Sequence, residues 1–530
     1  MSDSSQAEGR EQLAADPSTI LQGFDSFSAA ARSTAVQGNV RTVGARTTVA
    51  YYTCKSTEQL ATNLRVSGEV NASFLFGSGD AKSKYVQSLN ITETSVVVAV
   101  YADVVTGSAQ ATDVSWAPKT VPPTAATLND FYQGYGDSYV STLTTGAEYI
   151  ATYVLYSQST EQQQEIVASL TASGIGESGT VSGSLETAVS QAASSSKVET
   201  AFNQTLIGIT GLPLPSQDDL AAFALSFDTR TPDAPEIISF ETTGYEHVPG
   251  STSGVFDPIL ASRELLLGDT TGTGLVGAAD VVSQLDNQIA RIQEVYACYG
   301  YTGDAKLAQR AGQVADDRQA LGSVLAELRK DPTRTPLLPT LPSLRYGTPA
   351  VDVAVTVGGE FGTPGNQPFQ DLDYLAVLQR TQLTALSFGE YTPANLPVAL
   401  WDSLTAVYLT PDGSPRTVAH GEGAPSPTWQ LQPGEFVSGY TYTLTSDGGL
   451  LGQLTLTTQR GGVQLQTLTW PQALPSAAPS DSALGYTVPA GSVAVGFAGT
   501  LATDQSPVAI GTFGLQLATF TPARWQQRTA

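Results

Sequence analysis

The stretch that most constrains the fold of this chain is residues 131–157, in which a loop of glycine and aromatic residues leads into a long strand-favouring run. Residues 149–156 are mostly β-branched or aromatic, and such residues are enriched in strands. A second run, residues 91–106, is almost continuously apolar, which suits a strand buried on both faces of a sheet. The two runs predict long central strands against which the rest of this half of the chain has to pack.

Shorter segments on either side predict further strands of the same sheet. Residues 43–53 predict the opening strand, and residues 206–210 and 236–243 predict two later ones. Residues 1–40 are mostly small and polar, so they predict a loosely held extension.

A short motif lies at the start of the strand-favouring run. From Tyr135 the residues read Tyr-Gly-x-x-Tyr, and Gly146 follows after six more residues. This motif resembles the signature of the membrane attack complex/perforin superfamily, which is normally Tyr/Trp-Gly-Thr/Ser-His-Phe/Tyr-x6-Gly-Gly. Asp137 and Ser138 stand where Thr and His are usual, and Ala147 replaces the second glycine. The matching residues are Tyr135, Gly136, Tyr139 and Gly146.

The resemblance implies a bent central sheet with one helical cluster before the signature and one after it. In pore-forming members of that family each cluster refolds into a membrane-spanning β-hairpin. Gly146 would then serve as a bend point of the long sheet, because a residue without a side chain permits a backbone kink.

The region before the signature has a pattern that fits such a hairpin. From residue 66 to residue 76 the even positions are apolar or small and the odd ones are polar up to Leu75. A transmembrane strand needs about 9–11 residues and alternates lipid-facing with lumen-facing side chains. Residues 65–90 are therefore predicted to form the first hairpin. The residues assigned to its lipid face are Val66, Val70, Ala72, Phe74 and Phe76.

The region after the signature fits two periods. Val181, Leu185 and Val189 recur on one face of a strand, and we assign them to the lipid face of a second hairpin over residues 160–205. Leu185, Ala188, Val189 and Ala192 also recur at the spacing of an amphipathic helix. A segment that fits both periods is what a fold-switching region requires. The alternative is a flexible surface segment rich in Ser, Ala and Gly.

Charge and hydropathy limit the partners. Lys plus Arg number 25 and Asp plus Glu number 49, which gives a formal net charge of −24. This charge repels phosphate backbones and anionic leaflets, so we expect no nucleic-acid partner. The sequence contains no run of eighteen consecutive apolar residues, so it predicts no transmembrane helix. No standard secretory signal is visible at its start. We expect a soluble protein that is released by a non-standard route and acts on a target membrane.

Few residues suggest chemistry. Cys54 and Cys298 lie far apart, which favours reduced, buried thiols over a disulfide. His247 and His420 lie near no nucleophile motif and no second metal ligand, so we expect no enzyme, no metal and no cofactor. Residues 272–277 read GxGxxG, but without a βαβ unit around them they predict a glycine-rich helix start. The acidic residues are expected on solvent-exposed faces.

The second half of the chain changes character twice. Residues 251–331 carry apolar residues at helical spacing in two stretches, which predicts a helical pair joined by residues 299–303. Residues 332–349 are rich in proline and predict a stiff linker. Short strand patterns separated by Gly, Pro and Asp turns follow, which predicts an all-β domain over residues 350–530.

Several motifs of this last domain occur in the order seen in jacalin-like lectins, which it resembles. They include Gly358-Gly359, residues 420–423 and residues 508–511. The resemblance implies a three-sheet β-prism in which an Asp before the Ala-Ile-Gly turn and the early glycine loop bind sugar hydroxyls. Val508 stands at that Asp position, so simple mannose or galactose is expected to bind weakly. The glycan loop is predicted at Gly358, Gly359 and the nearby Asp504.

The sequence thus predicts a multidomain α+β protein. Its predicted parts are an extension (1–40), a perforin-like domain with a bent sheet and helical clusters (41–250), a helical segment (251–331), a linker (332–349) and a jacalin-like β-prism (350–530). The predicted function is targeting to a membrane lipid or glycan, assembly of soluble monomers into a homo-oligomeric ring, and insertion of hairpins that close into a barrel. The alternative is a non-lytic glycan- or lipid-binding protein that uses the first domain as an assembly scaffold, which the Ser-rich second cluster favours.

Overall fold

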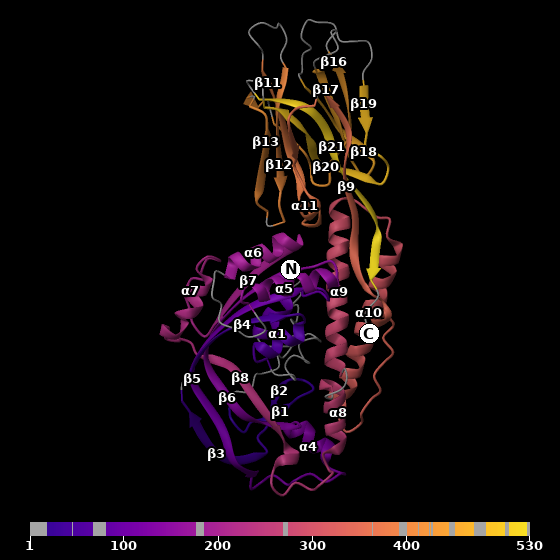
Figure 1. Cartoon of the computed structure of the whole chain (residues 1–530). Coiled ribbons are helices and arrows are strands. Elements are labelled where there is room, and N and C mark those ends of the chain that lie inside the picture. The colour runs from indigo at the N-terminus through magenta and orange to yellow at the C-terminus, as the bar shows by residue number, and fades with distance from the viewer. Residues whose placement is uncertain are drawn as a thin grey trace, which may run out of the picture. The chain divides into compact units, whose positions relative to one another are not determined.

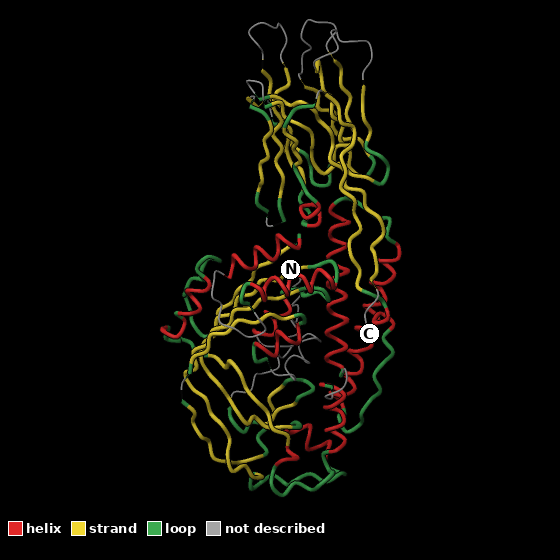
Figure 2. The backbone as a smooth tube through the Cα atoms, in the orientation of Figure 1, coloured by secondary structure: helices red, strands yellow, loops and turns green. Residues whose placement is uncertain are grey.

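The structure is a computed structural model of the chain, shown as a cartoon in Figure 1 and as a backbone tube in Figure 2. It combines helices and strands and divides into two compact units. Unit 1 consists of Met1–Gln288, Arg310–Thr348 and Gln526–Ala530, and unit 2 consists of Ile289–Gln309 and Pro349–Trp525. The described residues are 19–44, 46–66, 81–175, 185–268, 274–362, 364–391, 400–411, 413–422, 424–425, 428–444, 451–470, 484–503 and 508–526.

Two long antiparallel strands form the centre of unit 1. They are β5 (Val96–Trp116) and β6 (Ser138–Tyr156), and they pair from Val96 opposite Leu155 to Gln110 opposite Thr142. Their outer neighbours change halfway along. One half of the sheet is completed by β4 (Thr47–Cys54) and β7 (Glu199–Ile207), and the other half by β3 (Val36–Val43) and β8 (Glu236–Gly244).

The change of neighbours falls at Gly146. The pairing of β6 with β8 ends at this residue, and the pairing with β7 begins at Glu148. The register of β5 against β6 also shifts at this level, between Val105 and Gly107. A side chain on Gly146 would overlap the carbonyl group of Val104, so the close approach of the two strands requires glycine. The predicted bend residue therefore lies at the irregularity of the sheet.

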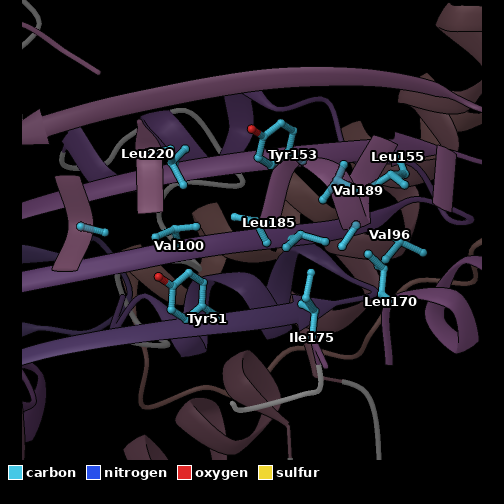
Figure 3. Close-up of a cluster of buried hydrophobic side chains, with 14 of the residues drawn as sticks. Tyr51, Val96, Val100, Tyr153, Leu155, Leu170, Ile175, Leu185, Val189 and Leu220 are labelled. Carbon is cyan, nitrogen blue, oxygen red and sulfur yellow. The ribbon is translucent and has the colours of Figure 1, made fainter. Parts of the chain in front are cut away.

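Each face of the β4 to β7 half is covered by helices. One face carries α5 (Thr160–Ala172), α6 (Leu185–Ser196) and α7 (Leu220–Leu225), which pack on the even-numbered residues of β5. Figure 3 shows this cluster, in which Leu170, Leu185 and Val189 meet Val96 and Leu155. The opposite face carries α1 (Thr57–Asn63) and α3 (Ala81–Ser88), which pack on the odd-numbered residues of β5. Ser56 caps α1 and Ser159 caps α5 by accepting hydrogen bonds from backbone N–H groups.

Within the predicted loose extension over residues 1–40, the described residues 19–40 contribute strands to this sheet, which corrects that prediction for this part of the chain. The short strands β1 (Gly23–Asp25) and β2 (Ala30–Arg32) pair with each other, and β1 pairs with β6. The side chains of Phe24 and Phe27 are fully buried. Sequence patterns missed these strands because they are too short to show a period.

The region after β8 is helical, as the sequence predicts. It contains α8 (Asp257–Leu267), α9 (Leu275–Cys298) and α10 (Ala305–Lys330). The side-chain amide of Asn287 in α9 donates to the carbonyl oxygen of Ile91, 3.0 Å away, which holds this part of α9 against the start of β5.

Unit 2 contains three antiparallel sheets in the order expected of a β-prism. The first consists of β10 (Gln367–Gln370), β20 (Ser492–Ala502), β21 (Ala509–Gln526) and β9 (Thr348–Gly362). The second consists of β13 (Pro415–His420), β12 (Leu400–Leu409) and β11 (Gln382–Tyr391), with β14 (Ala424–Pro425) and β15 (Trp429–Gln430) beside β11. The third consists of β18 (Val463–Trp470), β17 (Leu451–Arg460), β16 (Phe436–Leu444) and β19 (Leu484–Thr487).

Candidate functional site

Tyr135, Gly136 and Tyr139 of the signature lie where α4 (Leu128–Tyr135) passes into β6, and Gly146 lies further along β6. Gly136 has a φ of 79° and packs so closely on Phe24 that a side chain would overlap its carbonyl group. Both features require glycine. Tyr139 packs against Tyr245, with ring centroids 5.9 Å apart. The signature therefore joins the first strands of the chain to the centre of the sheet.

Asp137, which departs from the family pattern, is buried and makes a specific set of contacts. Its Oδ1 accepts from the backbone N–H of Ser26 at 2.7 Å, and its Oδ2 accepts from Nε of Arg263 in α8 at 3.0 Å. Arg263 also donates to Glu246 at 3.3 Å. The carboxylate of Asp137 thus links α8 to the start of β6 and to Ser26.

Only part of the predicted lipid-facing set lies within the described residues. Val66 is buried, whereas Val70, Ala72, Phe74, Phe76 and Val181 lie outside the described part of the chain. Leu185 and Val189 belong to α6 and are buried against the sheet. Of the two periods in this region, the helical one is therefore realised in this structure, because it places Leu185, Ala188, Val189 and Ala192 on one buried face.

The helices on the two faces are inserts that leave the sheet at the same end. The first insert, which contains α1 and α3, connects β4 to β5, and the second, which contains α5 and α6, connects β6 to β7. At this end Cys54 lies opposite Val97, Val96 lies opposite Leu155, and Tyr156 lies opposite Glu199. Both inserts therefore begin and end on neighbouring strands at one level of the sheet.

Beneath the first insert lie two buried carboxylates. Asp103 of β5 and Glu148 of β6 are directly opposite each other in the register, and both side chains are fully buried. This overturns the expectation that the acidic residues lie on solvent-exposed faces. Part of the signal is present in the sequence, since Asp103 interrupts the run at residues 91–106 that predicts a strand buried on both faces.

Each carboxylate has one basic partner, and both partners come from the first insert. Arg65, which follows α1, approaches Asp103 Oδ2 to 2.7 Å. Lys82 in α3 places its Nζ 2.9 Å from Glu148 and also donates to the carbonyl oxygens of Leu64 and Ile238. Tyr101 of β5 donates to both carboxylates, with its hydroxyl 3.2 Å from Asp103 Oδ2.

The electrostatics of this group follow from its burial. Desolvation is the main cause that raises the pKa of Glu148, while the ammonium of Lys82 opposes the shift. Desolvation also raises the pKa of Tyr101 far above its usual range, and the Glu148 and Asp103 carboxylates add to this effect. Tyr101 therefore stays a hydrogen-bond donor. The group therefore places two buried ion pairs between the sheet and the first insert.

In unit 2 the residues predicted to form a glycine loop belong to a strand. Gly358 and Gly359 lie inside strand β9. A side chain at either position would overlap the ring of Tyr486, so the glycines are needed for packing between the strand and this tyrosine. Asp504, the third predicted residue of the glycan loop, lies outside the described residues.

Polar groups instead gather where β9, β13 and β20 end. The side chain of Asn366 accepts from the backbone N–H and the hydroxyl of Thr503, both at 2.9 Å. The backbone N–H of Val508 donates to Glu422, which follows β13, at 3.2 Å. A carboxylate from another segment thus lies beside the position at which the lectin pattern expects Asp.

A third polar group lies inside the prism. Asp371 is buried and accepts from the hydroxyl of Tyr408, while its Oδ1 lies 2.6 Å from Nε2 of His420. The ring of Phe369 stacks on His420 at 3.8 Å. Because this group is enclosed by side chains, we assign it to the stability of the prism.

No group of three or more His, Cys, Asp or Glu side chains in the described part of the chain is arranged to hold a metal ion. Cys54 and Cys298 are both free, and burial raises the pKa of Cys54 to about 11. Where the structure describes the chain, no helix has both the length and the apolar character that crossing a bilayer requires.

No family model and no curated protein matches the chain. Solved structures with partial likeness include Malaysian banana lectin, which is 18% identical with a TM-score of 0.21 over 31% of this chain and 98% of that chain. A mannose-binding jacalin-related lectin from Ananas comosus is 20% identical with a TM-score of 0.22 over 31% of this chain and 96% of that one. Lamprey immune protein is 15% identical with a TM-score of 0.23 over 32% of this chain and 44% of that one. At these scores the likeness carries no argument, and the prism is described from its own strand pairing.

Proposed function

We propose that this chain is a pore-forming protein of the membrane attack complex/perforin type whose prism carries it to glycans on a target membrane. The observation that supports this most is that both helical inserts leave the same end of four consecutive antiparallel strands. Each insert connects two neighbouring strands. It can therefore extend those two strands as a hairpin without any change in strand order.

The lengths of the inserts agree with this role. A strand that crosses the hydrocarbon core needs about 9–11 residues. Residues 55–95 and 157–198 each exceed two such strands and a turn. Two hairpins from one protomer leave unpaired strand edges, which the bilayer does not tolerate, so many protomers have to close a barrel together.

The prism would supply targeting. Asn366 bonds to Thr503 and Glu422 bonds to the backbone of Val508, and amide, hydroxyl and carboxylate groups of these kinds bind sugar hydroxyls. Glu422 takes the role of the missing Asp beside Val508. Glu422→Gln in the full chain is expected to abolish binding to glycan-coated beads, whereas Asp352→Asn, at the opposite end of β9, should leave binding unchanged.

The pore hypothesis predicts that even-numbered residues of 66–76 face lipid and odd-numbered residues face the lumen, which substitutions can test. An Arg on the lipid face near the bilayer midplane costs about 2–4 kcal/mol per strand, and every protomer of a ring carries that cost. Val70→Arg and Ala72→Arg are therefore expected to abolish dye release from liposomes. Asn71→Arg, on the lumen face, is the matched control and should leave release largely intact.

Each variant first has to show the melting temperature and membrane binding of the unmodified protein. Equal leakage by odd and even variants would contradict the hairpin assignment. An unmodified protein that decorates vesicles and leaves them intact would favour the second candidate, a non-lytic binding protein. The feature that favours this candidate is the small, Ser-rich composition of α6.

A further inference from the structure

The ion pairs beneath the first insert are arranged in a way that simple stability does not explain. Both acids belong to the sheet, whereas both bases belong to the insert, one directly after α1 and the other at the start of α3. Lys82 is almost completely buried, with 5% of its side chain exposed, and Glu148 is fully buried. A buried ion pair between two segments couples those segments, because separating the partners leaves uncompensated charges in a poorly hydrated site.

The two pairs depend on each other through the sheet. Asp103 and Glu148 are cross-strand neighbours, and like charges directly opposite in a sheet destabilise it. Tyr101 bridges the two carboxylates from the same strand face. Arg65 and Lys82 offset the repulsion only while α1 and α3 lie on the sheet. The first insert cannot leave without exposing two adjacent, unpartnered carboxylates.

We propose that Arg65–Asp103 and Lys82–Glu148 form an autoinhibitory clamp that holds α1 and α3 on the sheet until the protein has assembled on a membrane. The clamp rests on the proposed pore function, since it regulates the release of the same insert. The backbone geometry of Arg65 indicates that this contact serves to hold the insert in place and does more than stabilise the fold. Arg65 adopts a left-handed backbone conformation with a φ of 59°, so its side chain is held over Tyr101 and Asp103 at a cost in local strain.

The second insert provides the internal reference. Among the residues that the structure describes, no ion pair joins α5 or α6 to the sheet, and their buried residues are apolar apart from Ser196. If only the first insert is clamped, removing these charges should speed amide exchange in α1 and α3 and leave exchange in α5 and α6 unchanged.

The test uses the full chain with one or both pairs replaced by neutral residues of similar size. Lys82→Met with Glu148→Gln removes one pair, and Arg65→Gln with Asp103→Asn removes the other. Neither change leaves a lone buried charge, so the soluble fold is kept. Lys84→Met, an exposed lysine on the same helix, is the matched control.

The first readout is amide hydrogen exchange in the absence of membranes. In the Lys82→Met/Glu148→Gln variant, peptides covering α1 and α3 are expected to exchange at least about tenfold faster, which corresponds to about 1.4 kcal/mol. Peptides covering α5 and α6, and the whole Lys84→Met variant, should exchange as in the unmodified protein. Unchanged exchange in α1 and α3 would overturn the clamp.

The second readout is the lag before dye release from phosphatidylcholine vesicles that carry a mixed glycolipid fraction. The neutral variants are expected to shorten this lag by about tenfold. Leakage with an unchanged lag would overturn the clamp and leave the pore function standing. If the unmodified protein binds these vesicles without leakage, the pore function fails, while the exchange result still decides whether the ion pairs hold the insert.

Discussion

The two helical inserts of unit 1 cover opposite faces of one half-sheet, yet they are held in different ways. The first, with α1 and α3, combines apolar contacts with the buried ion pairs of Arg65 and Lys82. The second, with α5 and α6, packs through small and aliphatic side chains such as Ile166, Leu170 and Leu185. Two segments with the same position in the topology therefore differ in the chemistry of their attachment.

This difference has a physical consequence. Apolar contacts are non-directional and lose strength in proportion to the area exposed, so an insert held by them can detach gradually. A buried ion pair is directional, and removing one partner leaves a charge in a poor environment. We therefore expect the first insert to leave the sheet in one step and the second to loosen by degrees.

The largest loss of stability is expected when only one partner of an ion pair is removed. Lys82→Ala leaves Glu148 buried without its partner and beside Asp103, and removing one partner of a buried pair costs about 3–5 kcal/mol. Amide exchange of peptides from β5 and β6 should report this loss in the free energy of opening of unit 1. The control Lys84→Ala, on the exposed face of α3, should change it by less than about 0.5 kcal/mol. If the two substitutions lowered the free energy of opening by the same amount, the buried ion pair would contribute no more to stability than an exposed lysine does.

A smaller and more local effect is expected at the second insert. Leu185→Ala removes one of the few large side chains that α6 buries, which costs about 2–5 kcal/mol in a rigid core and less where the site can collapse. Faster exchange should be confined to α5 and α6. Ser190→Ala, at an exposed position of the same helix, should leave the exchange unchanged or slightly slower. If the loss instead spread to α1 and α3, the two inserts would behave as one unit and the contrast would fail.

The smallest effect concerns pH. Burial raises the pKa of Glu148, so the folded form binds its proton more tightly than the unfolded chain does. The stability that this group contributes is present in acid and is lost as the pH rises through the raised pKa. The difference in unfolding free energy between the unmodified protein and Glu148→Gln should therefore grow as the pH falls toward 4.5.

Glu165→Gln, an exposed position in α5, is the control and should show no such trend. Denaturant titrations of the three proteins at several pH values measure the effect. A difference that shrinks on acidification would contradict the prediction and would mean that the ammonium of Lys82 outweighs the effect of burial on the pKa of Glu148.

Much of this fold could be predicted from sequence patterns. The apolar run at residues 149–156 lies in β6, most of the run at residues 91–106 lies in β5, and helical spacing predicts α9 and α10. Such elements are long enough for a period to stand out from chance. The three-residue strands β1 and β2 are not, and their place depends on pairing with residues more than a hundred positions away.

The functional groups were harder to predict for a different reason. Asp103 and Glu148 are 45 residues apart in the chain and become neighbours only through the register of β5 and β6. Glu422 and Val508 meet because the ends of β13 and β21 share one end of the prism. Gly358 and Gly359 are predicted as part of a glycan loop because their place in the motif order resembles that of jacalin-like lectins, whereas in the structure the ring of Tyr486 requires them. Composition cannot distinguish these two uses of glycine.

The central claim is that both inserts become extensions of β4, β5, β6 and β7 on a membrane. Amide hydrogen exchange of the unmodified protein, in solution and on glycolipid vesicles after dye release, tests it most directly. The claim predicts that peptides covering residues 57–63, 81–88, 160–172 and 185–196 pass together from the moderate protection of surface helices to the strong protection of paired strands within lipid. Dye release with unchanged protection of these peptides would contradict it.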